Sequence, residues 1–195
     1  MIKSKGIILI VVLIFIIGWG ITQVGIAAEN VAEGEGRKDY VLEIIGTSGD
    51  DMLGDYYVKT GLFKIDVSHI DGAYVRISSD DLVITGLVVE WCDNYLIVTN
   101  QAKVEQKKMT LTGDKIEYFS KTEELIATGN LEITTEDAVI YADSMTHLQQ
   151  EDRTEFIDNV IIQLSDGKIY TERCIMLGEE EQMQFIGSVR GEFQR

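Results

Sequence analysis

The C-terminal half of this chain repeats itself at a fixed interval of 29 residues. The stretch TGDKIEYFSKTEELIATGNLEI (112–133) is followed, 29 residues later, by the related stretch YADSMTHLQQEDRTEFIDNVII (141–162). Successive copies align at a small residue followed by an acid, in the pairs Gly113-Asp114, Ala142-Asp143 and Thr171-Glu172. A unit of this length cannot bury its apolar side chains alone, so the repeat predicts stacked units that share one continuous core.

Shorter copies of the unit lie upstream. The segment ITGLVVEW (84–91) aligns with LTGDKIEY (111–118) at a shift of 27 residues, and KTGLFKID (59–66) aligns with ITGLVVEW at a shift of 25. Together the copies indicate about five units of 25–29 residues, clear over 82–193 and weaker over 40–81. We therefore expect residues 29–195 to form one repeat-built domain.

Apolar and polar residues alternate within each unit. Phe156, Val160 and Ile162 share one parity, while Asn159 and Gln163 share the other. A period of two is typical of half-buried strands. In the first strand of each unit the parity slips at the small-acidic pair, which predicts a bulge or corner there. With about two strands per unit, the sequence predicts an all-β, solenoid-like pair of twisted sheets with about ten strands.

The first 28 residues differ from the rest of the chain. Two lysines within the first five residues precede an uninterrupted apolar run at 7–17, and two alanines end the segment. This order is typical of a secretory signal peptide. Residues 6–28 are also long enough to cross a bilayer as one helix, so both signal cleavage and membrane anchoring stay open. Either outcome exports residues 29–195.

The composition excludes several classes of function. The formal net charge is −16, so the surface repels nucleic acid. The chain has no proline, which leaves every backbone N–H available for strand pairing. Cys92 and Cys174 occupy different positions in distant units, so we expect no disulfide between them. No CxxC pair or zinc-type spacing indicates a metal or a cofactor.

The recurring pattern TGDKIEY…LIATGNLEI…AVIYADSMT…FIDNVIIQLSDGKIYTE, placed after an export leader, resembles the OstA-like domain of the lipopolysaccharide-transport (Lpt) periplasmic proteins. The likeness is clear from residue 82 to 189 and weak from 40 to 81. Two positions depart from the family pattern, because Glu172 stands for the usual aspartate and Gly187-Ser188 for the usual glycine-asparagine pair.

The resemblance implies a twisted, open double sheet, described as a β-jellyroll or β-taco, without enzymatic activity or a cofactor. It implies that acyl chains of lipopolysaccharide or a related lipid ride between the sheets. It also implies that exposed terminal strands pair edge to edge with other Lpt proteins, or head to tail with copies of the same chain. The implied location is the periplasm, either soluble after signal cleavage or tethered to the inner membrane by residues 6–28.

Inward-facing positions of the repeat supply the candidate lipid-binding residues. These candidates are Trp91, Ile116, Tyr118, Leu131, Ile133, Met145, Phe156, Val160, Ile162 and Val189. A wall that includes methionine suits loose acyl chains, because methionine adapts its shape. The same residues would equally fill an ordinary sandwich core. The alternative function is therefore a structural β-solenoid that oligomerises through its edge strands and carries no lipid.

An acidic column of Asp114, Asp143 and Glu172 suggests a third class, because stacked carboxylates in a β-helix can form a glycosidase pair. The small residue before each acid instead favours a tight corner, where aspartate commonly bonds nearby backbone. His147 shares a column with Tyr118 and Met176 and is interpreted as a half-buried filler, not a ligand. We therefore expect no catalysis.

Overall fold

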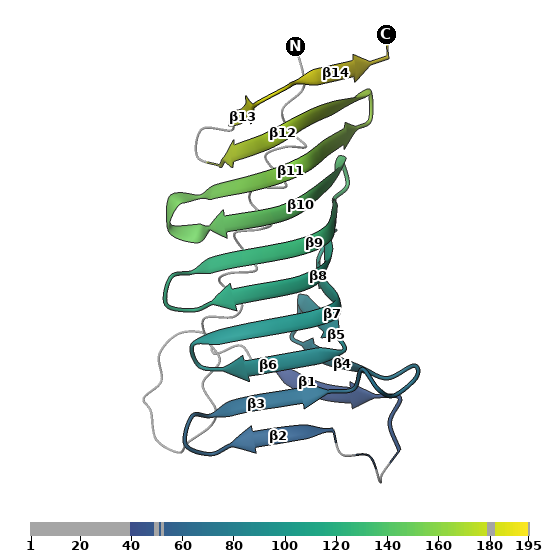
Figure 1. Cartoon of the computed structure of the whole chain (residues 1–195), viewed down its shortest axis with the longest axis vertical. Helices are drawn as coiled ribbons and strands as arrows, with labels where there is room; N and C mark the ends of the chain where they lie inside the picture. The colour runs from purple at the N-terminus through teal and green to yellow at the C-terminus, as the bar shows by residue number, and fades with distance from the viewer. Residues whose placement is uncertain (1–39, 49–50, 52, 179–181, 195) are drawn as a thin grey trace.

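The computed structural model of the chain describes residues 40–48, 51, 53–178 and 182–194. In these ranges fourteen β-strands form one antiparallel sheet and no α-helix occurs, which confirms the predicted all-β double sheet (Figure 1). The first strands are β1 (Val41–Ile45), β2 (Gly54–Tyr57), β3 (Leu62–Asp66), β4 (Tyr74–Ser78), β5 (Leu82–Gly86) and β6 (Val88–Cys92). The others are β7 (Tyr95–Gln106), β8 (Met109–Phe119), β9 (Glu124–Thr134), β10 (Ala138–Leu148), β11 (Arg153–Leu164), β12 (Gly167–Leu177), β13 (Gln182–Ile186) and β14 (Arg190–Phe193), with a short 3-10 turn, η1 (Gln149–Glu151), before β11.

Each long strand bends near its middle and contributes to two layers. The first half of β7 pairs with β6 and its second half with β5, and the register of β7 with β8 breaks between Thr99 and Ala102. Similar breaks recur as far as the pairing of β11 with β12. We call the layer with β2, β3, β6 and β13 layer A, and the layer with β1, β4, β5 and β14 layer B. The two layers meet along the line of register breaks, which we call the corner. The hairpin turns at the opposite end of each layer are called the tips.

Two backbone devices turn the corner. On β8 the parity of buried residues slips between Gly113 and Ile116, as the alternation predicted. On β7, β9 and β11 two consecutive residues adopt the left-handed conformation, with φ between 50° and 77°, in the pairs Asn100-Gln101, Gly129-Asn130 and Asp158-Asn159. Glycine, asparagine and aspartate adopt this conformation more readily than most residues. Such a pair leaves the alternation unchanged: Phe156 before the pair Asp158-Asn159 and Val160 after it are both buried. The alternation of the sequence therefore does not reveal this bend.

Counted through the corner, the fourteen strands of the described ranges form ten bent rungs, whereas the sequence predicted about ten strands. Six are the continuous strands β7 to β12, and four are the split pairs β1/β2, β3/β4, β5/β6 and β13/β14. In Figure 1 the rungs stack along the long axis from β2 to β14. The proposed alignment of 59–66 with 84–91 is wrong, because Gly61 lies in a tip turn and Gly86 lies at the corner. Both places use a Thr-Gly pair, which a short alignment does not separate.

Apolar burial between the layers holds the sheet in its bent shape. The core extends along the whole sheet, from Ile65 and Val75 to Cys174 and Met176. The outer faces carry ion pairs such as Lys64–Glu90, whose Nζ and Oε1 atoms lie 2.7 Å apart. Exposed pairs of this kind contribute only about 0–1 kcal/mol each. The interior is therefore the main source of stability.

The expected leader at 1–28 lies outside the described residues, so signal cleavage or anchoring stays a prediction. Within the described ranges, no helix has the length and apolar character needed to span a membrane.

Candidate functional site

Apolar side chains line the space between the layers in cross-strand rows. One row of layer A runs in register across eight strands and consists of Val89, Val98, Ile116, Ala127, Met145, Phe156, Cys174 and Phe185. The middle row of layer B is largely β-branched and consists of Leu42, Ile77, Ile84, Val104, Leu111, Ile133, Ile140, Ile162 and Ile169. The two rows give the interior a continuous apolar surface along the molecule.

Small residues allow the layers to approach each other at the corner. Gly86, Ala102, Gly113 and Ala142 occupy the row of layer B beside the corner and are all buried. A Cβ atom added to Gly86 would lie 2.3 Å from Cγ1 of Val98 in layer A. Such a contact forces the neighbouring side chain to shift. The two layers are therefore in contact at the corner, although larger residues such as Leu131 lie in the same row.

The interior is closed in this structure. A cavity of about 10 Å³ lies between Ile84 and Val104 of layer B and Val98 and Ile116 of layer A. This volume holds no more than about one water molecule. Of the two arrangements that the sequence left open, a groove or a filled core, the residues that the structure describes show the packing of a filled core.

Nine of the ten candidate lipid-binding residues face this interior. The fully buried ones are Ile116, Tyr118, Leu131, Ile133, Met145, Phe156, Val160 and Ile162. Trp91 is half-buried on β6 and packs against the core. Val189 differs from the expectation, because its side chain is 53% exposed. It belongs to the terminal rung, where no further strand covers it, and lines an open hollow of about 350 Å³ with Val160 and Tyr170. Contact of these residues with lipid stays a prediction.

His147 is more deeply buried than predicted. Its side chain is 1% exposed. Its cross-strand neighbours Leu125 and Thr154 are also fully buried. Its Nδ1 atom lies 2.9 Å from Oγ1 of Thr154. Burial lowers the pKa of His147 to about 4, although a hydrogen bond with the backbone of Arg153 raises this pKa in part. The imidazole is therefore neutral at physiological pH.

Two glutamines at the tips were missed by the sequence analysis. Gln106 ends β7 at a tip of layer B and is 1% exposed, and Gln149 begins η1 at a tip of layer A and is also buried. Each carries side-chain atoms with no hydrogen-bond partner among the described residues. Parity places Gln106 inward after Val104, but a glutamine at a hairpin end is normally interpreted as a solvated turn residue.

The acidic column lies on the outer side of the corner. Nδ2 of Asn130 donates to Oδ2 of Asp114 at 3.0 Å, and Nδ2 of Asn159 donates to Oδ2 of Asp143 at 2.8 Å. Each bond links a bulge on one strand to a left-handed pair on the next. The corner position was predicted correctly, but these carboxylates bond side chains of the next strand where local backbone was expected. Among the described residues, no group of His, Cys, Asp or Glu is arranged to hold a metal ion.

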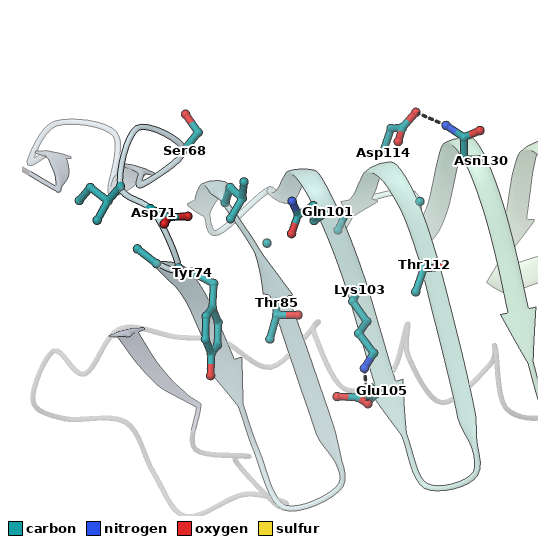
Figure 2. A pocket seen from close by; sticks show the side chains of 17 residues that line it. Ser68, Asp71, Tyr74, Thr85, Gln101, Lys103, Glu105, Thr112, Asp114 and Asn130 are labelled. Atoms are coloured by element: carbon teal, nitrogen blue, oxygen red, sulfur yellow. Dashed lines mark hydrogen bonds and ion pairs between the residues drawn. The ribbon is translucent and has the colours of Figure 1, made fainter. Parts of the chain in front are cut away.

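A second hollow, of about 820 Å³, lies on the outer face of layer B beside the corner. Figure 2 shows Thr85, Lys103 and Thr112 next to one another on this face, with Tyr74 at one end. Nζ of Lys103 forms an ion pair with Oε1 of Glu105 at 2.7 Å. The lining mixes charged, hydroxyl and aromatic groups with apolar residues such as Ile70 and Leu87, and so contrasts with the uniformly apolar interior.

Both cysteines are free thiols, as predicted. Cys92 is half-buried on β6, whereas Cys174 is fully buried in the layer A row. Burial raises the pKa of the Cys174 thiol to about 12. Cys174 therefore acts as a small apolar filler, because a thiol with so high a pKa is not reactive at neutral pH.

Comparison with solved structures reveals a similar architecture in the crystal structure of LptH, the LptA homologous periplasmic component of the conserved lipopolysaccharide transport device from Pseudomonas aeruginosa. The TM-score is 0.52, the sequence identity is 12%, and the match covers 58% of this chain and 95% of LptH. This chain has an LptH-like fold. No family model and no curated protein sequence matches the chain. At this identity the likeness to LptH concerns the fold, and function is inferred from the interior and the edges.

Proposed function

We propose that this chain is an exported, non-enzymatic component of lipopolysaccharide transport that binds acyl chains between layers A and B. The observation that supports it most is the apolar interior, which is continuous along the rungs and ends at both terminal strands. The LptH-like fold adds support. The proposed location is the periplasm, where the protein is either released by signal cleavage or tethered by residues 6–28.

The physical basis of binding is exchange of one apolar contact for another. Burying an acyl chain contributes about 0.8 kcal/mol per CH₂ group. Separating the layers costs the contacts that the two middle rows now make with each other. Because each row would then pack against the chain, much of that cost is recovered.

Co-elution tests this proposal. The purified protein is incubated with lipopolysaccharide or with the same polysaccharide after removal of its acyl chains, and each mixture is separated by size-exclusion chromatography. We expect only the acylated form to elute with the protein, because the interior binds chains and the acidic surface repels anionic groups. Equal co-elution of both forms, or of neither, would contradict the proposal.

The second part of the proposal is edge-to-edge pairing with other Lpt proteins or with copies of this chain. Among the described residues, β1, β2, β13 and β14 each pair on one side only. Of the nine large apolar side chains that are exposed in the described part of the chain, seven lie in or beside these strands, namely Val41, Tyr56, Tyr57, Val58, Ile186, Val189 and Phe193. Unpaired edges with exposed apolar side chains are templates for strand addition.

Charges on the C-terminal edge are expected to weaken this association. Replacing Val189 and Phe193 together with lysine should raise the concentration needed for association by about tenfold or more, because edge lysines oppose strand pairing. Sedimentation over a concentration series measures the effect. The control is Tyr141→Lys, which alters an exposed tyrosine on the outer face of the central strand β10. Equal behaviour of the double variant and the control would refute edge pairing.

The filled interior supports a second candidate function. A purely structural solenoid would assemble through its edges with the core shown here and would bind no lipid. It predicts end-to-end oligomers that are free of lipid after purification and do not elute with lipopolysaccharide.

A further inference from the structure

The unpaired polar atoms of this fold are concentrated at the tips. Arg173 is ion-paired with Glu155, and Asp152 also has a partner. The other described residues with such buried side-chain atoms are Tyr40, Ser79, Gln106, His147 and Gln149. All five lie at tips, in both layers, whereas the middle rows are apolar. A buried polar atom without a partner is costly in a folded protein. Its repeated occurrence at the tips therefore requires an explanation.

The tips form two lines, one on each layer, at the sides of the layers that lie farthest from the corner. Tyr118 lies at a tip of layer A, and its pKa is raised by burial, by Glu123 and by Tyr40, which precedes layer B strand β1. Tyr40 therefore lies close to Tyr118 across the interior. We call Gln106, His147 and Gln149 the lip.

Polarity changes in a defined order from the lip inward. The next inward-facing residue after His147 is Met145, and the next after Gln106 is Val104. Both are fully buried and belong to the apolar rows. A molecule that enters between the tips thus meets hydrogen-bonding groups first and an apolar surface below them. An acylated lipid has the same order of groups: a polar linkage next to the headgroup, followed by an apolar chain.

We propose that the lip binds the neutral polar group, an ester, amide or hydroxyl, that joins an acyl chain to its headgroup. This inference rests on the proposed function, because the chain itself must occupy the interior. The amides of Gln106 and Gln149 each offer donors and an acceptor. Nε2 of His147, which has no hydrogen-bond partner among the described residues, donates or accepts according to its tautomer.

The charges around the lip favour a neutral partner over an anionic one. No lip residue carries a charge, because the pKa of His147 lies near 4. Lys107 and Lys108 directly follow Gln106, and Lys108 is ion-paired with Glu136. Over all the tip turns of the described residues acids outnumber lysines, with Asp80, Asp93 and Asp137 among them. A phosphate placed there is repelled, whereas a neutral carbonyl or hydroxyl is not.

The test compares two soluble probes with the same ten-carbon chain and a neutral sugar headgroup. Decanoyl-N-methylglucamide carries an amide at the junction, and decyl glucoside carries only an ether-type oxygen. Binding to the full protein is measured by equilibrium dialysis below the critical micelle concentrations. We expect the amide probe to bind about tenfold more tightly, the factor that one or two hydrogen bonds contribute.

The deciding variant is Gln106→Met, which has nearly the same shape and loses no hydrogen bond within the described chain. It should fold, retain decyl glucoside binding and lose the preference for the amide. Its matched control is Gln163→Met, the same change on the outer face of β11, which should keep the preference.

Three outcomes separate the lip from the proposed function. Loss of the preference in Gln106→Met but not in Gln163→Met supports the lip. Equal binding of both probes by the unmodified protein, or an unchanged preference in Gln106→Met, overturns the lip and leaves chain binding intact. Binding of neither probe overturns acyl-chain binding itself, and the lip inference with it.

Discussion

Replacing Phe156 with alanine is expected to lower the free energy of unfolding by about 3–5 kcal/mol. The side chain is 0% exposed and lies between Met145 and Cys174 in the layer A row. The loss combines the transfer free energy of the ring with the cavity that a packed interior leaves behind. Urea denaturation measures it as a lower midpoint with an unchanged slope.

Phe193→Ala is the matched control for this variant. Phe193 lies on the terminal strand β14 and is 50% exposed, so the same truncation should cost well under about 1 kcal/mol. A small loss for Phe156→Ala would show that the interior is loosely packed in solution. Such a result would contradict the closed core and favour an open groove in the free protein.

Gly129→Ala is expected to destabilise the protein by about 2–3 kcal/mol through the corner. Gly129 has a φ of 77°, which costs an alanine about 1–2 kcal/mol. In addition, the new Cβ would lie 2.3 Å from Oδ2 of Asp114. The carboxylate must then move, and its hydrogen bond from Asn130 is lost. Thermal and urea unfolding both measure the effect.

Gly61→Ala separates the two causes. Gly61 has a similar φ of 64°, and a Cβ added there would meet nothing within 4 Å. This control should therefore show only the conformational cost of about 1–2 kcal/mol. Removing the carboxylate first, with Asp114→Ala, should reduce the effect of Gly129→Ala towards that of Gly61→Ala. If Gly129→Ala and Gly61→Ala cost the same, the corner bond contributes nothing.

The fold was largely predictable because its determinants are local. Alternation around Ile116 and Val160 fixed which residues face inward, and the small-acidic pairs located the corner on β8, β10 and β12. The bends at Asn100-Gln101 and Asp158-Asn159 escaped prediction, since two left-handed residues leave the parity unchanged. The first unit was misaligned because a Thr-Gly pair serves a tip turn at Gly61 and a corner at Gly86.

The site was predictable only in part. Sequence parity identified the interior lining, but the same residues line a groove or fill a core, and the difference is the distance between two layers. That distance depends on packing between residues that are far apart in sequence, such as Ile84 and Ile116, which line the same small cavity from the two layers. The burial of Gln106 depends on the same long-range closure and was not recognised. His147 was placed in an inward column, but its nearly complete burial was not predicted. The predicted burial of Val189 was wrong because the alternation of the sequence does not indicate which rung lies at the end of the sheet.

Photocrosslinking tests directly whether acyl chains occupy the interior. A small diazirine amino acid is placed at Val160, which is buried in the interior, or at Ile161, the next residue, which faces outward. Each protein is illuminated in the presence of lipopolysaccharide. If acyl chains occupy the interior, we expect a lipid adduct at position 160 and none at position 161. Adducts at neither position, together with lipid-free oligomers, would contradict it and leave the structural scaffold as the function of this fold.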